Sequence, residues 1–199
     1  MPETFIVYAC PVGELADQLD RYFQQSLTFC GENAAHRYMP HCTLTGFFQD
    51  EEVAIPLYVQ ALDRALKQAQ PSPDPVVTIQ KLTFRSDWHG LELQSDWLKK
   101  VIAIFAELAV SPTRSDALRL KDWLHLSLAY EFQFEHSESL IQLAQECIDL
   151  QASVQWELRF YQRHADYRWT CHQSWKLSSL LPIFGHAIST QTNSGNPHN

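Results

Sequence analysis

Residues 40–48 of this chain read Pro-His-Cys-Thr-Leu-Thr-Gly-Phe-Phe, and residues 124–130 read Leu-His-Leu-Ser-Leu-Ala-Tyr. Each stretch contains His-x-[Thr/Ser]-Leu in a setting that favours β-strands, and the two copies lie in different halves of the chain. Successive side chains of a strand point to opposite faces, so His41 shares a face with Thr43 and Thr45. We therefore predict two strands that each present an imidazole and a hydroxyl on one side and core residues on the other.

The second copy presents the same pair of groups, His125 and Ser127. Two imidazoles and two hydroxyls around one small anion suit the hydrolysis of a phosphodiester, above all a strained cyclic one. Of His41 and His125, one neutral ring can take a proton from the attacking water while the other, protonated, donates to the leaving ribose oxygen. The hydroxyls of Thr43 and Ser127 would hydrogen-bond phosphate oxygens as their negative charge grows. This scheme needs no metal ion and no other cofactor.

The paired motifs resemble those of the two-histidine (2H) phosphoesterase superfamily, which includes cyclic nucleotide phosphodiesterases and 2′–5′ RNA ligase-like proteins. The form His-x-Thr-Leu-x-Gly-Phe-Phe, with a second motif that continues as Ala-Tyr-Glu-Phe at residues 129–132, is most similar to the phosphodiesterase domain of suppressor of T-cell receptor signalling proteins. The resemblance covers about residues 4–182, although only the motifs are specific. No ubiquitin-associated, SH3 or histidine-phosphatase region accompanies the motifs in these 199 residues, so we do not expect that family's signalling role here.

The order of the expected elements indicates an α+β protein, and the resemblance implies its arrangement. We expect one bilobal domain over residues 1–185, with two pseudo-twofold-related, mainly antiparallel sheets, helices outside and a central cleft. Apolar residues at helical spacing predict a helix over residues 97–108, and strict alternation predicts a hairpin of strands 154–160 and 169–177. Residues 186–199 are small and polar, and we predict that they form a disordered tail.

The formal net charge of −8 limits the partners that we expect. It argues against a protein that coats long nucleic acid, but it allows a cyclic mononucleotide or a short RNA end as substrate. The start of the sequence shows no signal peptide, and no apolar run is long enough to span a membrane. Five cysteines without paired spacing fit free thiols. We therefore expect a cytoplasmic monomer without membrane contact.

A third His-x-Ser occurs at His172 and Ser174, but Trp175 follows it instead of leucine. The alternation of the predicted hairpin places His172 and Ser174 on a solvated polar face, so we interpret them as unrelated to the two motifs. Arg37, in the loop before the first motif, could contact a substrate phosphate, because guanidinium pairs well with phosphate oxygens. The competing interpretation of Arg37 is an ordinary solvated loop residue.

Two other functions stay open at the level of sequence. A nucleotide- or RNA-end-binding module without turnover would use the same face, although binding alone has no need of two proton-transfer groups. A metal site could draw on the set His36, His41, Cys42, His125 and Cys171, but these residues lack recognised ligand spacing. Cys42 also points away from His41 on a strand. Our prediction is therefore a metal-independent cyclic phosphodiesterase that acts on a ribose 2′,3′-cyclic phosphate.

Overall fold

One antiparallel sheet runs through the part of the chain that the computed structural model describes, residues 2–69 and 77–177. Its eight strands are β1 (Glu3–Val12), β2 (Cys42–Thr43), β3 (Phe48–Asp50), β4 (Thr78–Phe84), β5 (Trp88–Gln94), β6 (His125–Tyr130), β7 (Gln155–Arg163) and β8 (Trp169–Leu177). They hydrogen-bond in the order β4-β5-β6-β2-β1-β7-β8, and β3 pairs with the start of β1. The domain boundary and the tail predicted at residues 185–199 lie outside the described residues.

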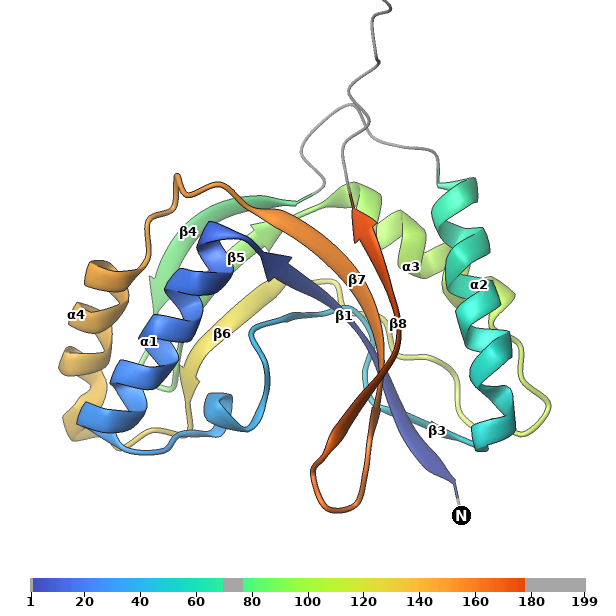
Figure 1. The fold of residues 1–199 in the computed structure, drawn as a ribbon, viewed down its shortest axis with the longest axis horizontal. Helices are drawn as coiled ribbons and strands as arrows, with labels where there is room; N and C mark the ends of the chain where they lie inside the picture. Colours follow the sequence, from blue (N-terminus) through green and yellow to red (C-terminus); the bar gives the residue numbers. More distant parts are fainter. Residues whose placement is uncertain (1, 70–76, 178–199) are drawn as a thin grey trace, which may run out of the picture.

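The sheet is strongly curved, and helices flank both of its ends (Figure 1). α1 (Glu14–Cys30) lies with α4 (Ser137–Cys147) at one end, and α2 (Ile55–Gln68) lies with α3 (Asp96–Leu108) at the other. Short 3-10 turns occur at η1 (Ala34–Arg37), η2 (Glu52–Ala54) and η3 (Phe134–His136). The predicted helix over residues 97–108 is confirmed as α3. None of these helices is long and apolar enough to cross a lipid bilayer.

β1, near the centre of the sheet, is buried on both faces. Phe5, Val7 and Ala9 belong to the main apolar core, to which all four helices contribute. The alternate residues Ile6 and Tyr8 belong to a second, smaller cluster on the opposite face. The nearly continuous apolar run of β1 follows from this position, because a strand with core on both sides has no solvated face. The second face is the one on which the candidate site is built.

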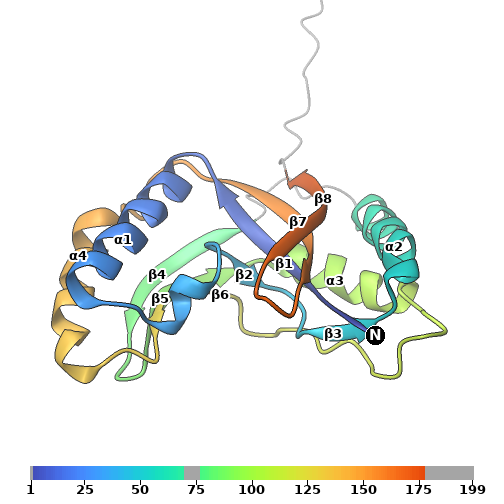
Figure 2. The ribbon, with the colours of Figure 1, turned by 60° about the horizontal axis from the view of Figure 1, so that its bottom comes forward.

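The α+β class, with antiparallel strands and outer helices, is confirmed. The expectation of two separate sheets is corrected, because β2 pairs with both β1 and β6 and thereby joins the two halves into one sheet. Figure 2 shows β2 between these two neighbours. The physical reason is that a strand in the middle of the molecule must satisfy its backbone groups on both edges. In the middle of the sheet, β2 and β6 provide hydrogen-bond partners for each other's backbone groups.

The predicted hairpin is formed by β7 and β8, and a bulge in it corrects the placement of His172. The register shifts after Phe160, which changes the alternation along the hairpin. The ring of His172 lies 5.7 Å from that of Phe160 and 6.2 Å from that of Phe5, on the side of the main core. Its Nε2 lies 2.9 Å from Oε1 of Gln162, so His172 is half-buried rather than solvated. Ser174 keeps its predicted exposed position.

Asp50, at the end of β3, ties this strand to α2 and to the segment after α3. Tyr58 and Thr113 donate to its two carboxylate oxygens at 2.5 Å each, and the N–H of Glu51 donates at 2.8 Å. Arg114 donates in turn to the hydroxyl of Tyr58 at 2.9 Å. Burial alone would raise the pKa of Asp50, but the hydrogen bonds together hold this pKa below its usual value. The carboxylate is therefore an ionised group with both oxygens bonded.

Asp50→Asn is expected to lower the free energy of unfolding by about 1–3 kcal/mol, because the amide sets a donor against groups that already donate. The pKa of Asp50 is lower in the folded state than in the unfolded chain. The advantage of the wild type should therefore persist above about pH 4 and fade as pH falls through the folded-state pKa. Urea denaturation of both proteins over this range measures the effect. Asp63→Asn, in the exposed pair with Lys67, is the control, and an equal loss in both variants would contradict the assignment.

Candidate active site

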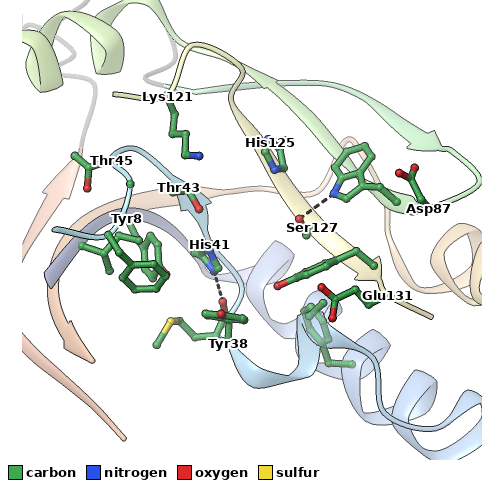
Figure 3. Close-up of a pocket in the computed structure, with 18 of the residues that line it drawn as sticks. Tyr8, Tyr38, His41, Thr43, Thr45, Asp87, Lys121, His125, Ser127 and Glu131 are labelled. Atoms are coloured by element: carbon green, nitrogen blue, oxygen red, sulfur yellow. Dashed lines mark hydrogen bonds between the residues drawn. The ribbon is translucent and has the colours of Figure 1, made fainter. Parts of the chain in front are cut away.

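A cavity of about 770 Å³ opens on the face of the sheet that carries the smaller apolar cluster. His41, Thr43, His125 and Ser127 all line it, so the structure brings both predicted motifs together (Figure 3). The antiparallel register of β2 and β6 sets Thr43 beside His125 and His41 beside Ser127. The two imidazoles thus occupy diagonal positions, each next to the hydroxyl of the other motif.

Both histidines are held by the backbone in the same way. His41 Nδ1 lies 2.7 Å from the carbonyl oxygen of Met39, and His125 Nδ1 lies 3.2 Å from that of Trp123. A carbonyl oxygen only accepts hydrogen bonds, so Nδ1 carries the hydrogen in both rings. Nε2 is thereby left to exchange a proton with a substrate, as acid–base catalysis requires.

Each imidazole also stacks on an aromatic ring. The ring centroids of His41 and Tyr8 lie 3.8 Å apart with 29° between the planes, and those of His125 and Trp123 lie 4.0 Å apart with 26°. Trp88 meets His125 in an edge contact at 5.3 Å. These contacts and the carbonyl hydrogen bonds restrict the rotation of both rings. The direction of each Nε2 is therefore set before a substrate binds.

Burial favours the neutral form of both imidazoles in the free protein. Desolvation lowers the pKa of His41 to about 4, against the opposing effect of its carbonyl partner. Desolvation is also the largest cause of the lowered pKa of His125. Lys121 and Arg85 lower it further, whereas Glu92 and the carbonyl partner favour the protonated ring. An anion bound between the imidazoles would raise both pKa values, because an opposite charge favours the protonated form.

Ser127 is oriented by an indole. Trp88 Nε1 donates to Ser127 Oγ at 2.9 Å, as the dashed line in Figure 3 shows. Because this oxygen already accepts a hydrogen bond, the hydroxyl hydrogen can point at an anion in the cavity. Thr45, the second hydroxyl of the first motif, accepts a hydrogen bond from the N–H of Val7 at 3.1 Å and is fully buried. Thr43 is only partly buried, so it is the first-motif hydroxyl with surface open to a substrate.

Two cations that the sequence analysis did not single out also line the cavity, Arg119 and Lys121. They belong to residues 119–121, which pair with residues 44–46 through backbone hydrogen bonds of 2.6 and 3.1 Å and an isolated bridge. Alternation along this short extended segment sends both cations to the cavity and Leu120 to the opposite side. The only signal in the sequence is one apolar residue between two basic ones, which is too short to separate a strand from a loop.

The remaining candidate residues lie away from the cavity or point elsewhere. Arg37 is exposed on η1, with its Nε 3.5 Å from Glu32 Oε1, and it does not line the cavity, so its contact with a substrate stays a prediction. Of the residues considered for a metal site, Cys42 is buried in the main core and Cys171 is exposed on β8. Among residues 2–69 and 77–177, no three His, Cys, Asp or Glu side chains are grouped as metal ligands.

The chain has the fold of a solved bacterial protein. The structure of Escherichia coli LigT complexed with ATP matches with a TM-score of 0.50 and 15% identity, over 89% of this chain and 99% of LigT. LigT is a 2H phosphoesterase. The fold class that this match and the cavity define is therefore the 2H phosphoesterase fold, as the paired motifs indicated.

Sequence comparison points to a particular group of relatives. Mouse ubiquitin-associated and SH3 domain-containing protein B is 33% identical over 177 residues, which are 87% of this chain and 27% of that protein. The ecdysteroid-phosphate phosphatase of Bombyx mori is 29% identical over 180 residues, which are 89% of this chain and 27% of that protein. No family model matches the chain. The resemblance to suppressor of T-cell receptor signalling proteins is thus confirmed, and the chain spans about a quarter of the length of these relatives.

Gly90→Ala is expected to displace the indole of Trp88 and so to weaken the hydrogen bond that orients Ser127. A Cβ at position 90 would lie 2.3 Å from the indole of Trp88 and 2.4 Å from the carbonyl oxygen of Leu126, so both the indole and the backbone of β6 must move. Overpacking of this kind costs about 1–3 kcal/mol of stability. Thermal melting and the NMR shift of the Trp88 indole N–H measure both effects, with Gln94→Ala at the exposed end of β5 as control. An unchanged melting temperature together with an unchanged indole signal would show that the contact is not needed.

Proposed function

We propose that this chain is a metal-independent phosphodiesterase that opens a ribose 2′,3′-cyclic phosphate, in a nucleotide or at a short RNA end. The observation that carries the proposal is the matched state of the two motif histidines. Both rings direct a free Nε2 away from a carbonyl-bound Nδ1, and both line one cavity with the hydroxyls of Thr43 and Ser127. A site that only bound the anion would gain nothing from two fixed proton-transfer groups.

The proposed reaction is an in-line displacement at phosphorus. One neutral Nε2 takes a proton from water as the water oxygen bonds to phosphorus. The bond from phosphorus to one ribose oxygen breaks, and the other imidazole donates its Nε2 proton to that oxygen. The product is a phosphate monoester, and the two histidines end with their protonation states exchanged. Solvent resets them before the next turnover.

The two motif hydroxyls fit the charge that develops in this step. As the cyclic diester reacts, negative charge grows on the non-bridging phosphate oxygens. Ser127 can donate to one of them, since its oxygen is already occupied by the N–H of Trp88. Thr43 lies beside His125 in the register of β2 and β6 and lines the cavity, which supports a donation from its hydroxyl to another of these oxygens. Donors fixed before the reaction stabilise the transition state without reorganisation.

The comparisons support a phosphoester substrate at a coarser level. The matched LigT structure contains ATP, a ligand with ribose and phosphate groups, and one relative is named a phosphatase of ecdysteroid phosphates. This chain spans about a quarter of that relative, so the activity in its name is not assigned here to these residues. The choice of a cyclic ribose phosphate rests on the paired histidines.

His41→Ala and His125→Ala are each expected to lower kcat on a 2′,3′-cyclic mononucleotide by about 10²–10⁴, the usual contribution of a positioned acid or base. Product analysis with the purified protein, in the presence of a strong chelator, measures the effect. His172→Ala is the matched control, because this ring packs on the main core and not on the cavity. Near-normal turnover in either folded motif variant would overturn the mechanism. Tight binding without turnover by the wild type would favour the binding module.

The pH profile of kcat/KM is expected to be bell-shaped with its maximum below about pH 6.5, the ordinary histidine value. The productive form needs one neutral and one protonated imidazole, and burial lowers the pKa of both His41 and His125. The two limbs belong to the coupled pair. A bound phosphate favours the protonated ring, so the kcat profile should lie at higher pH. A kcat/KM that rises steadily with pH, without a basic limb, would argue against a histidine acid.

A further inference from the structure

Lys121 is a cation in the cavity that neither motif includes. Its position is set by the backbone, because its N–H donates to the carbonyl oxygen of Leu44 at 3.1 Å within the pairing of residues 119–121 and 44–46. The same pairing continues the first motif beyond β2, so a segment directly before the second motif is fastened to the segment directly after the first. Lys121 is therefore held where the two motifs meet, four residues before His125.

The side chain of Lys121 points into the site. Figure 3 shows its ammonium group directed towards the space between Thr43 and His125. No carboxylate of residues 2–69 and 77–177 lies within ion-pair distance of this ammonium group. By contrast, the acidic residues of the cavity, Asp87 and Glu131, lie on the side away from Lys121 (Figure 3). The positive charge therefore faces the proposed phosphate position without a counter-ion from the described part of the chain.

We propose that Lys121 is a further catalytic residue, whose ammonium group contacts the phosphate held between His41 and His125. The proposal rests on the phosphodiesterase function proposed above. In the productive form, with one imidazole neutral, the two hydroxyls and two imidazoles supply one positive charge, whereas the pentacoordinate transition state concentrates additional negative charge on its oxygens. An ammonium group strengthens its contact as this charge grows, so it lowers the barrier rather than only the dissociation constant.

The charges that shift the pKa of His125 are consistent with an ammonium group of Lys121 close to this ring. The charged groups that act on its protonation are Lys121 and Arg85, which disfavour the protonated ring, and Glu92, which favours it. His41 is the neighbouring titratable group, and its charge interacts with that of His125. Removal of the Lys121 charge should therefore raise the pKa of His125 in the free protein, whether or not the protein turns over a substrate. This shift reports that the ammonium group lies close to the acid–base pair.

Lys121→Met keeps the aliphatic stem and removes the charge. We expect kcat on 2′,3′-cyclic AMP to fall about 10- to 100-fold, the size of one charge-assisted hydrogen bond, with a smaller change in KM. Lys121→Arg should recover part of the loss. The His125 pKa, followed by NMR titration, should rise in Lys121→Met. Lys100→Met, on the exposed surface of α3, makes the same change in net charge and should alter neither quantity.

A second substrate separates the scissile phosphate from any neighbouring one. The same cyclic nucleotide with a 5′-phosphate should show the same loss of kcat in Lys121→Met. A loss confined to the 5′-phosphorylated substrate would overturn the proposal, because Lys121 would then serve a second phosphate. An unchanged kcat on both substrates would overturn it as well.

Failure of the proposed function has a different signature. If the wild type hydrolyses neither substrate, the phosphodiesterase proposal fails, and inorganic phosphate becomes the probe of the site. Titration of phosphate, followed on the ring signals of His41 and His125, should then show affinity at least about tenfold weaker in Lys121→Met than in Lys100→Met. Equal affinities in the two variants would overturn the role of Lys121 at the phosphate.

Discussion

The pairing of β2 with β6 is the contact on which the site depends. β2 contains two residues and pairs with β6 through Cys42 and Leu126, yet this contact joins the two halves of the sheet. Both residues point into the main core, so burial of their side chains fixes the register. A slip by one position would turn the histidines and hydroxyls into the core and the apolar residues into the cavity. The face that carries the candidate site is therefore specified by the core residues on the opposite side of the two strands.

Local patterns in the sequence predict the features that depend on the geometry of a single helix or strand. The stripe that becomes α3 and the alternation of β7 and β8 are read directly, because the periods of 3.6 and 2 residues belong to single elements. The same alternation correctly sets His41 with Thr43, and His125 with Ser127, on one face each. The repeat of the whole motif carries the resemblance to the 2H phosphoesterases, and this resemblance implies the fold.

What the sequence does not predict depends on long-range pairing. The two expected sheets form one sheet because β2 pairs with β6. The periodicity of a single strand does not show which other strand it pairs with. The bulge after Phe160 inserts one residue into the hairpin and turns His172 towards the core, against the strict alternation. Lys121 enters the cavity only because its short segment pairs with the chain after β2. Trp88 reaches Ser127 across Gly90, a contact that depends on the absence of a side chain.

The two motifs repeat in sequence, but their surroundings differ in charge. His41 stacks on Tyr8, and the causes that set its pKa are burial, its own carbonyl partner and the other histidine. His125 stacks on Trp123, and Lys121 lies close enough to act on its protonation. A phosphate bound between the rings would raise both pKa values, while the charged neighbours of His125 give this ring a proton affinity different from that of His41. A duplicated motif can therefore supply two imidazoles of the same tautomer with unequal proton affinities, which would favour one ring as acid and the other as base in the proposed reaction.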